Sequence, residues 1–133
     1  MSGRYLLDTN ICIYIINQRP AEVLERFKRL SVEQVALSTI TWGELYFGAY
    51  KSERLQHNLR NMQALTGLLE VLPVPIAAAE HYGKVRAQLQ REGLPIGGND
   101  LWIAAHALAE KLTLVTHNTK EFERIEHLQL ENW

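Results

Sequence analysis

Two kinds of hydrophobic pattern alternate along the chain. Short apolar runs with β-branched residues are typical of buried strands, and they occur at residues 4–7, 35–38, 71–74, 113–116 and, more weakly, 128–131. Between these runs, apolar residues return at helical spacing, which predicts helices at residues 9–17, 21–30, 40–51, 54–69, 77–92 and 99–111. Gly93 ends the fifth helical pattern, as a glycine beyond a helix end commonly does.

This alternation predicts a single α/β domain. Strands separated by helices of this length need parallel crossover connections, so we expect a three-layer α/β/α sandwich around a parallel sheet of about five strands. The 133 residues suffice for one hydrophobic core and are too few for two ordinary domains. The expected organisation is therefore one domain over residues 1–133.

Acidic residues follow the predicted strands. Asp8 comes directly after the first strand, Glu44 lies one or two turns into the helix after the second, and Asp100 opens the helix that leads into the fourth. The loop at 116–121 follows that fourth strand. In an open parallel sheet, ligands bind beyond the carboxyl ends of the strands. We therefore expect the three carboxylates and this loop to lie at one edge of the sheet.

Each of these carboxylates also has a structural explanation. The aspartates are unusual here, because glutamate fills 13 of the 15 acidic positions. Asp8 and Asp100 nevertheless both stand where an aspartate could be a helix N-cap, which stabilises a helix by about 1 kcal/mol. Glu44 lies in a largely apolar helix, where a lone glutamate is often a solvated edge residue. None of the three identifies a catalytic site by itself.

Together the three carboxylates favour metal-assisted chemistry. Converging acids repel one another, and a divalent cation such as Mg²⁺ or Mn²⁺ with oxygen ligands relieves that repulsion. The five histidines are scattered, which argues against zinc; His117 alone falls in the loop at 116–121, as a plain loop residue or a substrate contact. A P-loop and a G-x-S-x-G nucleophile motif are both missing. The remaining class is metal-assisted hydrolysis of a phosphodiester.

The composition of the chain limits the kinds of partner that it can bind. The net charge of −1 argues against a protein that coats DNA, so any nucleic-acid contact must be local. No apolar run is long enough to span a bilayer, the amino terminus does not resemble a signal peptide, and a single cysteine fits a reducing cytoplasm. Two groups of basic residues, one following the Glu44 helix and one on the helix predicted at 77–92, could form a local phosphate-binding flank or simply solvated faces: Lys51, Arg54 and Arg60, and Lys84, Arg86 and Arg91.

Several conspicuous residues have mainly structural explanations. Cys12 lies among isoleucines, which favours a buried thiol over a catalytic one. Gly97 and Gly98 are expected to let the backbone turn tightly just before Asp100. Aromatic residues of the Glu44 helix are expected to pack in the core or in a dimer interface rather than to stack on bases: Tyr46, Phe47 and Tyr50.

Four motifs follow one another along the chain: LLDTNICIYII, STITWGELYFGA, GLPIGGNDLWIAAHAL and LVTHNTKEFERI. In this order they resemble PIN-domain proteins, and specifically the VapC toxins of VapBC toxin–antitoxin systems, and the resemblance spans residues 4–133. It implies a PIN fold and an endoribonuclease that depends on Mg²⁺ or Mn²⁺. In this resemblance Asp8 and Asp100 are the principal metal ligands, and Glu44 is a ligand directly or through water.

The fourth acidic position departs from the family pattern. Many PIN domains have an aspartate just after the fourth strand, where this chain has Asn118. The resemblance implies that Glu121, one helical turn on, is a catalytic acid and a weaker or second-site ligand. Asn118 would position water or substrate, or contribute a weak ligand, and the hydroxyls of Thr9 and Thr116 would assist.

The resemblance also implies a biological role. A VapC-like toxin hydrolyses RNA to 5′-phosphate and 3′-hydroxyl ends, typically in a tRNA such as the anticodon stem-loop of the initiator tRNA, and so inhibits translation. It forms homodimers, which can enter larger hetero-oligomers, and a VapB antitoxin neutralises it. The complex contacts promoter DNA only through that antitoxin, and no membrane partner is implied. Nothing in these residues reads an anticodon.

Three alternatives stay open. The chain could be a PIN nuclease of RNA maturation, which a neighbouring antitoxin gene would argue against. It could be a binding module that kept the fold and lost catalysis, although Asp8, Glu44 and Asp100 are all present. It could also be a receiver-type regulator with an acidic Mg²⁺ pocket. That last class expects a lysine after the fourth strand, and the sequence there reads THN.

Overall fold

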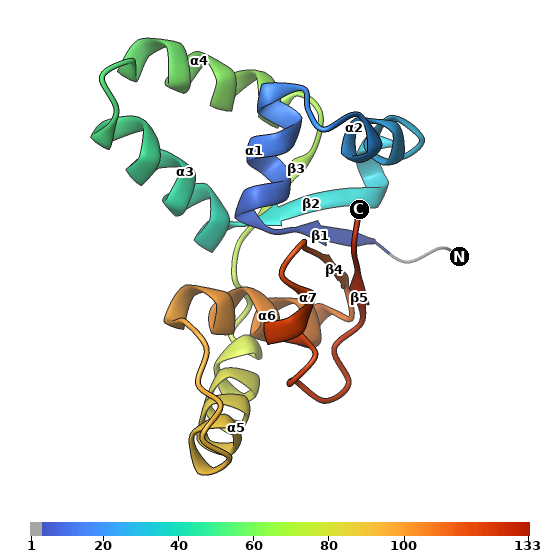
Figure 1. Cartoon of the computed structure of the whole chain (residues 1–133), viewed down its shortest axis with the longest axis vertical. Helices are drawn as coiled ribbons and strands as arrows, with labels where there is room; N and C mark the ends of the chain where they lie inside the picture. The colour runs from blue at the N-terminus through green and yellow to red at the C-terminus, as the bar shows by residue number, and fades with distance from the viewer. Residues whose placement is uncertain (1–3) are drawn as a thin grey trace.

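A five-stranded sheet between two layers of helices forms the computed structural model, which describes residues 4–133 (Figure 1). All strands run parallel, in the spatial order β3-β2-β1-β4-β5. Their bounds are Tyr5–Leu7 for β1, Val35–Ser38 for β2, Glu70–Leu72 for β3, Thr113–Val115 for β4 and Leu130–Glu131 for β5. The predicted α/β/α architecture with a central parallel sheet is confirmed.

The helices divide between the two faces of the sheet (Figure 1). One face is covered by α1 (Thr9–Asn17), α2 (Ala21–Lys28), α3 (Thr39–Lys51) and α4 (Leu55–Thr66). The other is covered by α5 (Ala78–Arg91), α6 (Gly98–Glu110) and α7 (Thr119–Phe122). Each face of the sheet has its own cluster of buried apolar side chains: the first core cluster lies under α1–α4 and the second under α5–α7. Side chains alternate along a strand, so Leu7 packs into the first core cluster and Leu6 into the second. Both are fully buried, because the sheet is covered on both faces.

Several predicted element bounds were wrong by a few residues. The strand predicted at 71–74 ends at Leu72, since Pro73 has no N–H for the ladder. The helix predicted at 54–69 ends at Thr66, before the poor helix former Gly67. The short helix α7 begins at Thr119, inside the predicted loop at 116–121, and ends at Phe122, which is buried.

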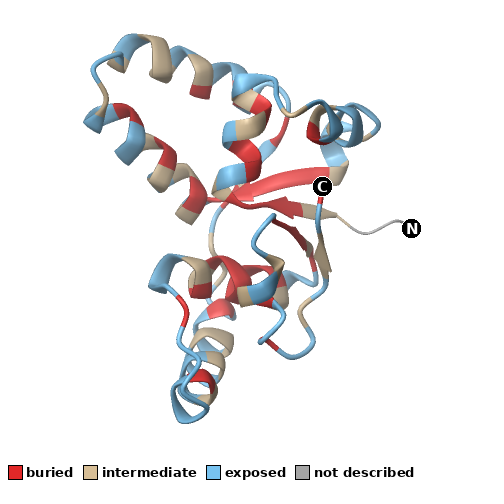
Figure 2. Cartoon of the chain, viewed as in Figure 1, coloured by how far each residue is buried: buried red, intermediate tan, exposed pale blue. Residues whose placement is uncertain are grey.

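Buried residues concentrate on the sheet and on the inner sides of the helices (Figure 2). Cys12 is fully buried, as predicted. Gly93 has φ +70 just beyond α5, which confirms it as the helix stop. The predicted tight turn at Gly97 was wrong, because its φ of −60 and ψ of 149 are open to any residue. Within residues 4–133, no helix combines the length and the apolar character needed to cross a membrane.

Candidate active site

Asp8 lies where β1 ends and α1 begins. It is only 6% exposed, and the N–H of Ile11 donates to its Oδ1 at 3.0 Å, so Asp8 is the N-cap of α1. Burial raises the pKa of the Asp8 carboxyl and nearby Glu44 adds to the rise. The hydrogen bonds from Thr116 and Ile11 and the charge of His117 act in the opposite direction. The capping explanation is therefore correct for Asp8, and it places a buried carboxylate at the edge of the sheet.

Asp100 is held differently. The N-cap of α6 is Gly97, so Asp100 lies in the first turn of the helix and the capping explanation was wrong for this residue. The helix dipole favours an acid there. Burial, and then the charges of Glu44, Glu121 and Asp8, raise the pKa of Asp100 to about 6. Acids from separate parts of the chain thus converge on Asp100, as the parallel topology predicts.

Glu44 joins three helices. The hydroxyl of Thr9, on α1, donates to its Oε1, and the amide of Asn99, on α6, donates to its Oε2 at 3.3 Å. Thr9 also lies 3.5 Å from the hydroxyl of Thr41, one turn before Glu44 on α3. Because these contacts orient the carboxylate, the interpretation of Glu44 as a plain solvated residue was wrong.

The loop after β4 places the other predicted site residues. Thr116 is fully buried, bonds to Asp8 and accepts the N–H of Asn118 at 2.9 Å. The side-chain amide of Asn118 donates to Oε2 of Glu121, on α7. Asn118 therefore orients Glu121, and Thr116 orients Asp8.

His117 is tied to the carboxyl-terminal part of the chain. Its Nε2–H donates to the carbonyl of Trp133 at 2.6 Å, and its ring packs against Tyr14 with centroids 4.9 Å apart. These contacts favour the prediction of a plain loop residue. The remaining influence of His117 on the site is its charge, which lowers the pKa of Asp8.

The chemistry of these side chains fits a hard divalent cation. Four carboxylates at the site offer oxygen atoms of the kind that such a cation binds, and the charges of the other three add to the rise that burial gives the pKa of Asp100. In residues 4–133, no three His, Cys, Asp or Glu side chains are already arranged as a metal site. The carboxylates of Glu44 and Glu121 instead accept hydrogen bonds from Asn99 and Asn118. Holding a cation would therefore require these two carboxylates to turn from their amide partners toward Asp100.

A groove of about 580 Å³ runs beside Glu44, with α3 on one side and the start of α6 on the other. Its lining includes Thr9, Glu44, Phe47 and Asn99. Phe47 and Tyr50 are each 66% exposed, so the expectation that they pack in the core was wrong. Their predicted place in a dimer interface stays a prediction.

Sequence reasoning missed three residues near the site. Asn99, which bonds to Glu44, immediately precedes Asp100 in GGND, and that adjacency was the available signal. Ser38 and His106, which bond to each other beneath the site, are 68 positions apart and gave no local signal.

Comparison with known proteins identifies the family. The family model for the PIN domain matches residues 5–128. The chain is 44% identical to ribonuclease VapC2 of Haemophilus influenzae over 130 residues, which cover 98% of each chain. The chain belongs to the VapC ribonucleases of the PIN-domain family. Among other VapC proteins it is 43% identical to the tRNA(fMet)-specific endonuclease VapC of Shigella flexneri, over 98% of each chain.

Solved VapC structures share the fold. The VapBC2 complex of Rickettsia felis, bound to a DNA fragment from its promoter, contains a chain that superposes with a TM-score of 0.91 and 42% identity. The match covers 97% of this chain and 98% of that one. The PIN fold predicted from the sequence is therefore confirmed, and the four carboxylates lie at the edge where parallel sheets bind ligands.

Proposed function

We propose that this VapC chain is a Mg²⁺- or Mn²⁺-dependent endoribonuclease toxin. The observation that carries the proposal is the convergence of Asp8, Glu44 and Glu121 on Asp100, whose pKa rises to about 6. Strongly shifted acids in an accessible cleft are typical of active sites, because an ordinary fold gains nothing from their repulsion.

Asp8, Asp100 and Glu44 are the residues that would hold the metal, with Glu121 as a weaker ligand. When bound there, such a cation would supply positive charge for the scissile phosphate and would lower the pKa of an attacking water. The residues around these acids prepare them for that role. Thr116 holds Asp8, and Thr9 and Asn99 hold Glu44, so two of the acids are oriented before substrate arrives. Asn118 holds Glu121 beside them and can also orient water or substrate.

A tRNA is the proposed substrate. The relative in Shigella flexneri, 43% identical over almost the whole chain, is a tRNA(fMet)-specific endonuclease. The groove along α3 passes Glu44, and the ring of Phe47 on its wall can stack on an unpaired base. Cleavage of initiator tRNA would inhibit translation, in the cytoplasm.

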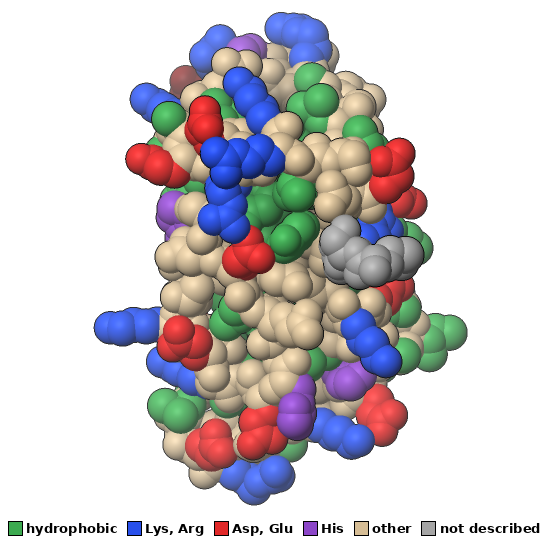
Figure 3. Space-filling view, turned by 90° about the vertical axis from the view of Figure 1, so that its right-hand side faces the viewer, with side chains coloured by type: hydrophobic (Ala, Val, Ile, Leu, Met, Phe, Trp, Pro, Cys, Tyr) green, Lys and Arg blue, Asp and Glu red, His purple; other side chains and the backbone are tan. Residues whose placement is uncertain are grey.

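A VapB-type antitoxin is the proposed partner. Chains 42% and 41% identical to this one occur in VapBC complexes from Rickettsia felis and Salmonella typhimurium, both bound to DNA. On the face of the molecule that Figure 3 shows, basic and acidic side chains are interspersed. With a net charge of −1, the chain would reach promoter DNA through the antitoxin rather than by itself. Homodimers and larger toxin–antitoxin assemblies belong to the same proposal.

Cleavage of purified tRNA tests this function. Wild-type protein and Asp8→Asn, purified identically, are incubated with total tRNA in Mg²⁺, Mn²⁺ or EDTA, and the fragment ends are sequenced. Discrete fragments with 5′-phosphates are expected from wild type with metal alone. Equal cleavage by both proteins would reveal a contaminating nuclease. The absence of both cleavage and Mn²⁺ binding would favour an inactive binding module.

A further inference from the structure

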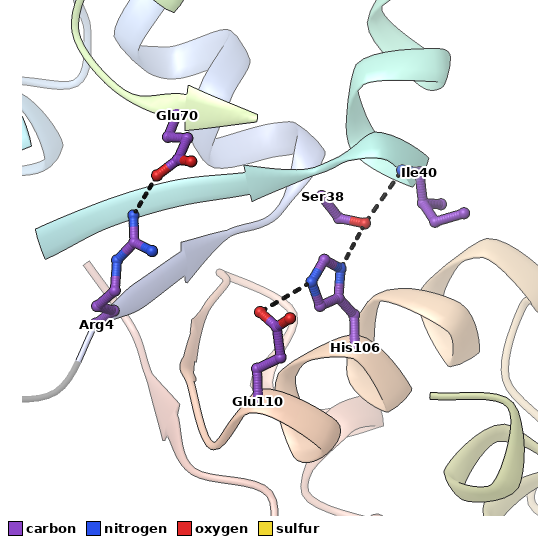
Figure 4. A network of polar contacts seen from close by, with 6 residues as sticks. All are labelled: Arg4, Ser38, Ile40, Glu70, His106 and Glu110. Atoms are coloured by element: carbon purple, nitrogen blue, oxygen red, sulfur yellow. Dashed lines mark hydrogen bonds and ion pairs between the residues drawn. The ribbon is translucent and has the colours of Figure 1, made fainter. Parts of the chain in front are cut away.

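A buried hydrogen bond links the two layers of helices beneath the acidic site. Nδ1 of His106, on α6, lies 2.9 Å from Oγ of Ser38, and both residues are fully buried (Figure 4). Ser38 is the last residue of β2 and the N-cap of α3, and its Oγ accepts the N–H of Ile40 at 3.1 Å. One serine hydroxyl therefore joins the first turn of α3 to the middle of α6.

The contacts around this pair assign its protons. Nε2 of His106 faces Oε2 of Glu110 at 3.5 Å, and a carboxylate favours the ring proton on the nitrogen that faces it. Nδ1 then carries no proton and accepts the hydroxyl proton of Ser38, whose oxygen in turn accepts the N–H of Ile40. Burial keeps the pKa of His106 below its ordinary value, against the attraction of Glu110, so the ring is neutral and can accept.

On α6, this bond lies on the side of the helix that also carries Asn99. Asn99 and His106 are seven residues apart on α6, which places them on one side of the helix two turns apart. Asn99 contacts Glu44 at the groove, and His106 contacts Ser38 at the sheet. Ser38 is the N-cap of α3, and Glu44 follows six residues later in the second turn of that helix. The α3–α6 contact is thus fixed at two levels, one at the acids and one beneath them.

We infer that His106 is a positioning residue for the ribonuclease, which acts through Ser38 to hold α3, and with it Glu44, at the correct distance from Asp100. The inference rests on the proposed function. His106 touches neither substrate nor metal. Its contribution is the fixed separation of the two acid-bearing helices, and a misplacement of about 1 Å at an active site can cost on the order of 100-fold in rate.

Two substitutions at His106 separate the hydrogen bond from the volume of the side chain. His106→Leu fills the space but offers no acceptor to Ser38, whereas Oδ1 of His106→Asn can take the place of Nδ1. We expect the leucine variant to lose on the order of 10- to 100-fold in kcat and in Mn²⁺ affinity, with little change in KM for tRNA. The asparagine variant should keep most of both. Leu112→Ala, in the core cluster that contains Ala104 and Ala107 of α6, controls for lost stability.

A double-mutant cycle tests whether the effect passes through Ser38. Ser38→Ala should slow cleavage as well, and the double variant with His106→Leu should be no slower than the worse single variant. Effects that multiply would overturn the inference, as would a leucine variant whose loss matches that of Leu112→Ala at equal thermal stability.

The nitrogen NMR signals of His106 give a test that needs no activity. An unprotonated Nδ1 and a protonated Nε2 are expected in wild type, with the signals changed in Ser38→Ala. A protonated Nδ1 would contradict the assignment. If wild type binds no Mn²⁺ and cuts no RNA while these signals are as expected, the proposed function fails but the buried bond stands.

Discussion

Asp8 and Asp100 are the same residue type at the same edge of the sheet, yet their surroundings differ. Asp8 is buried at the end of β1, where hydrogen bonds from Ile11 and Thr116 oppose the rise in its pKa. Asp100 lies in the first turn of α6, and burial and three other carboxylates all raise its pKa, to about 6. One aspartate has hydrogen-bond donors around it, and the other has acids.

The different surroundings of the two aspartates distinguish a structural role from a functional one. Asp8 is an N-cap as well as a candidate ligand, so its presence alone says little about chemistry. Asp100 caps nothing, and its ionised form destabilises the metal-free protein. A charge kept at a cost to the fold is typical of a functional site. We therefore expect substitutions at the two positions to act alike on cleavage and oppositely on stability.

The largest effect is expected from Asp8→Ala. Cleavage should fall to the level of the protein-free control, and the free energy of unfolding should fall by about 1–2 kcal/mol, because the cap of α1 is lost and buried donors lose their acceptor. Cleavage assays and urea unfolding measure the two effects. Asp8→Asn is the control, since asparagine also caps helices: it should be inactive with nearly wild-type stability. An active Asp8→Ala variant would remove Asp8 from the site.

Asp100→Asn should also abolish cleavage but stabilise the metal-free protein. The folded-state pKa lies above the ordinary value of 3.8, so this carboxyl contributes stability that is complete below about pH 4 and is lost as the pH rises through about 6. At pH 7 the variant should therefore be about 1 kcal/mol more stable than wild type, after allowance for solvent screening. At pH 4 the two should be equal. A variant less stable than wild type at pH 7 would contradict this comparison.

Metal affinity should rise with pH, whereas the stability that Asp100 contributes falls. A proton on Asp100 competes with the cation, so Mn²⁺ affinity measured by calorimetry should fall by about tenfold per pH unit below pH 6. Above that pH it should be nearly constant. Asp100→Glu, which keeps the charge on a longer side chain, should keep a pH dependence while binding more weakly. Affinity that does not change between pH 5 and 7 would exclude Asp100 as a ligand.

The sequence predicted the position of the acids better than their environments. Parallel topology alone brings the ends of β1, β2 and β4 to one edge, so Asp8 and Asp100 could be placed together from the pattern of strands and helices. Which of them is an N-cap depends on where each helix begins, and that varies by one or two residues.

Other features depend on tertiary contacts. The four residues of α7 are too short for a periodic pattern, and the helix is held by burial of Phe122 against the second core cluster. The bond between Ser38 and His106 joins positions 68 residues apart, and a lone histidine in an apolar helix gives no sign of its partner. Phe47 has the same apolar character as core residues, and its exposure follows from its outward face on α3.

The smallest effect is expected at Glu121, and it is judged against Glu44. Glu44 is held by Thr9 and Asn99 from two other helices, whereas Asn118, which holds Glu121, comes from the same loop. Glu44→Gln should reduce kcat on the order of tenfold or more, because the new side-chain amide would face the hydrogen-bond donors of Thr9 and Asn99. Glu121→Gln should reduce kcat only a few-fold. Glu123→Gln, an exposed neighbour on the same segment, controls for the lost charge and should cleave like wild type. If Glu121→Gln is the slower of the two glutamate variants in single-turnover cleavage of tRNA, then Glu121, and not Glu44, is the third principal acid. In that case the hydrogen bonds around Glu44 would serve to hold α1, α3 and α6 together rather than to prepare a ligand.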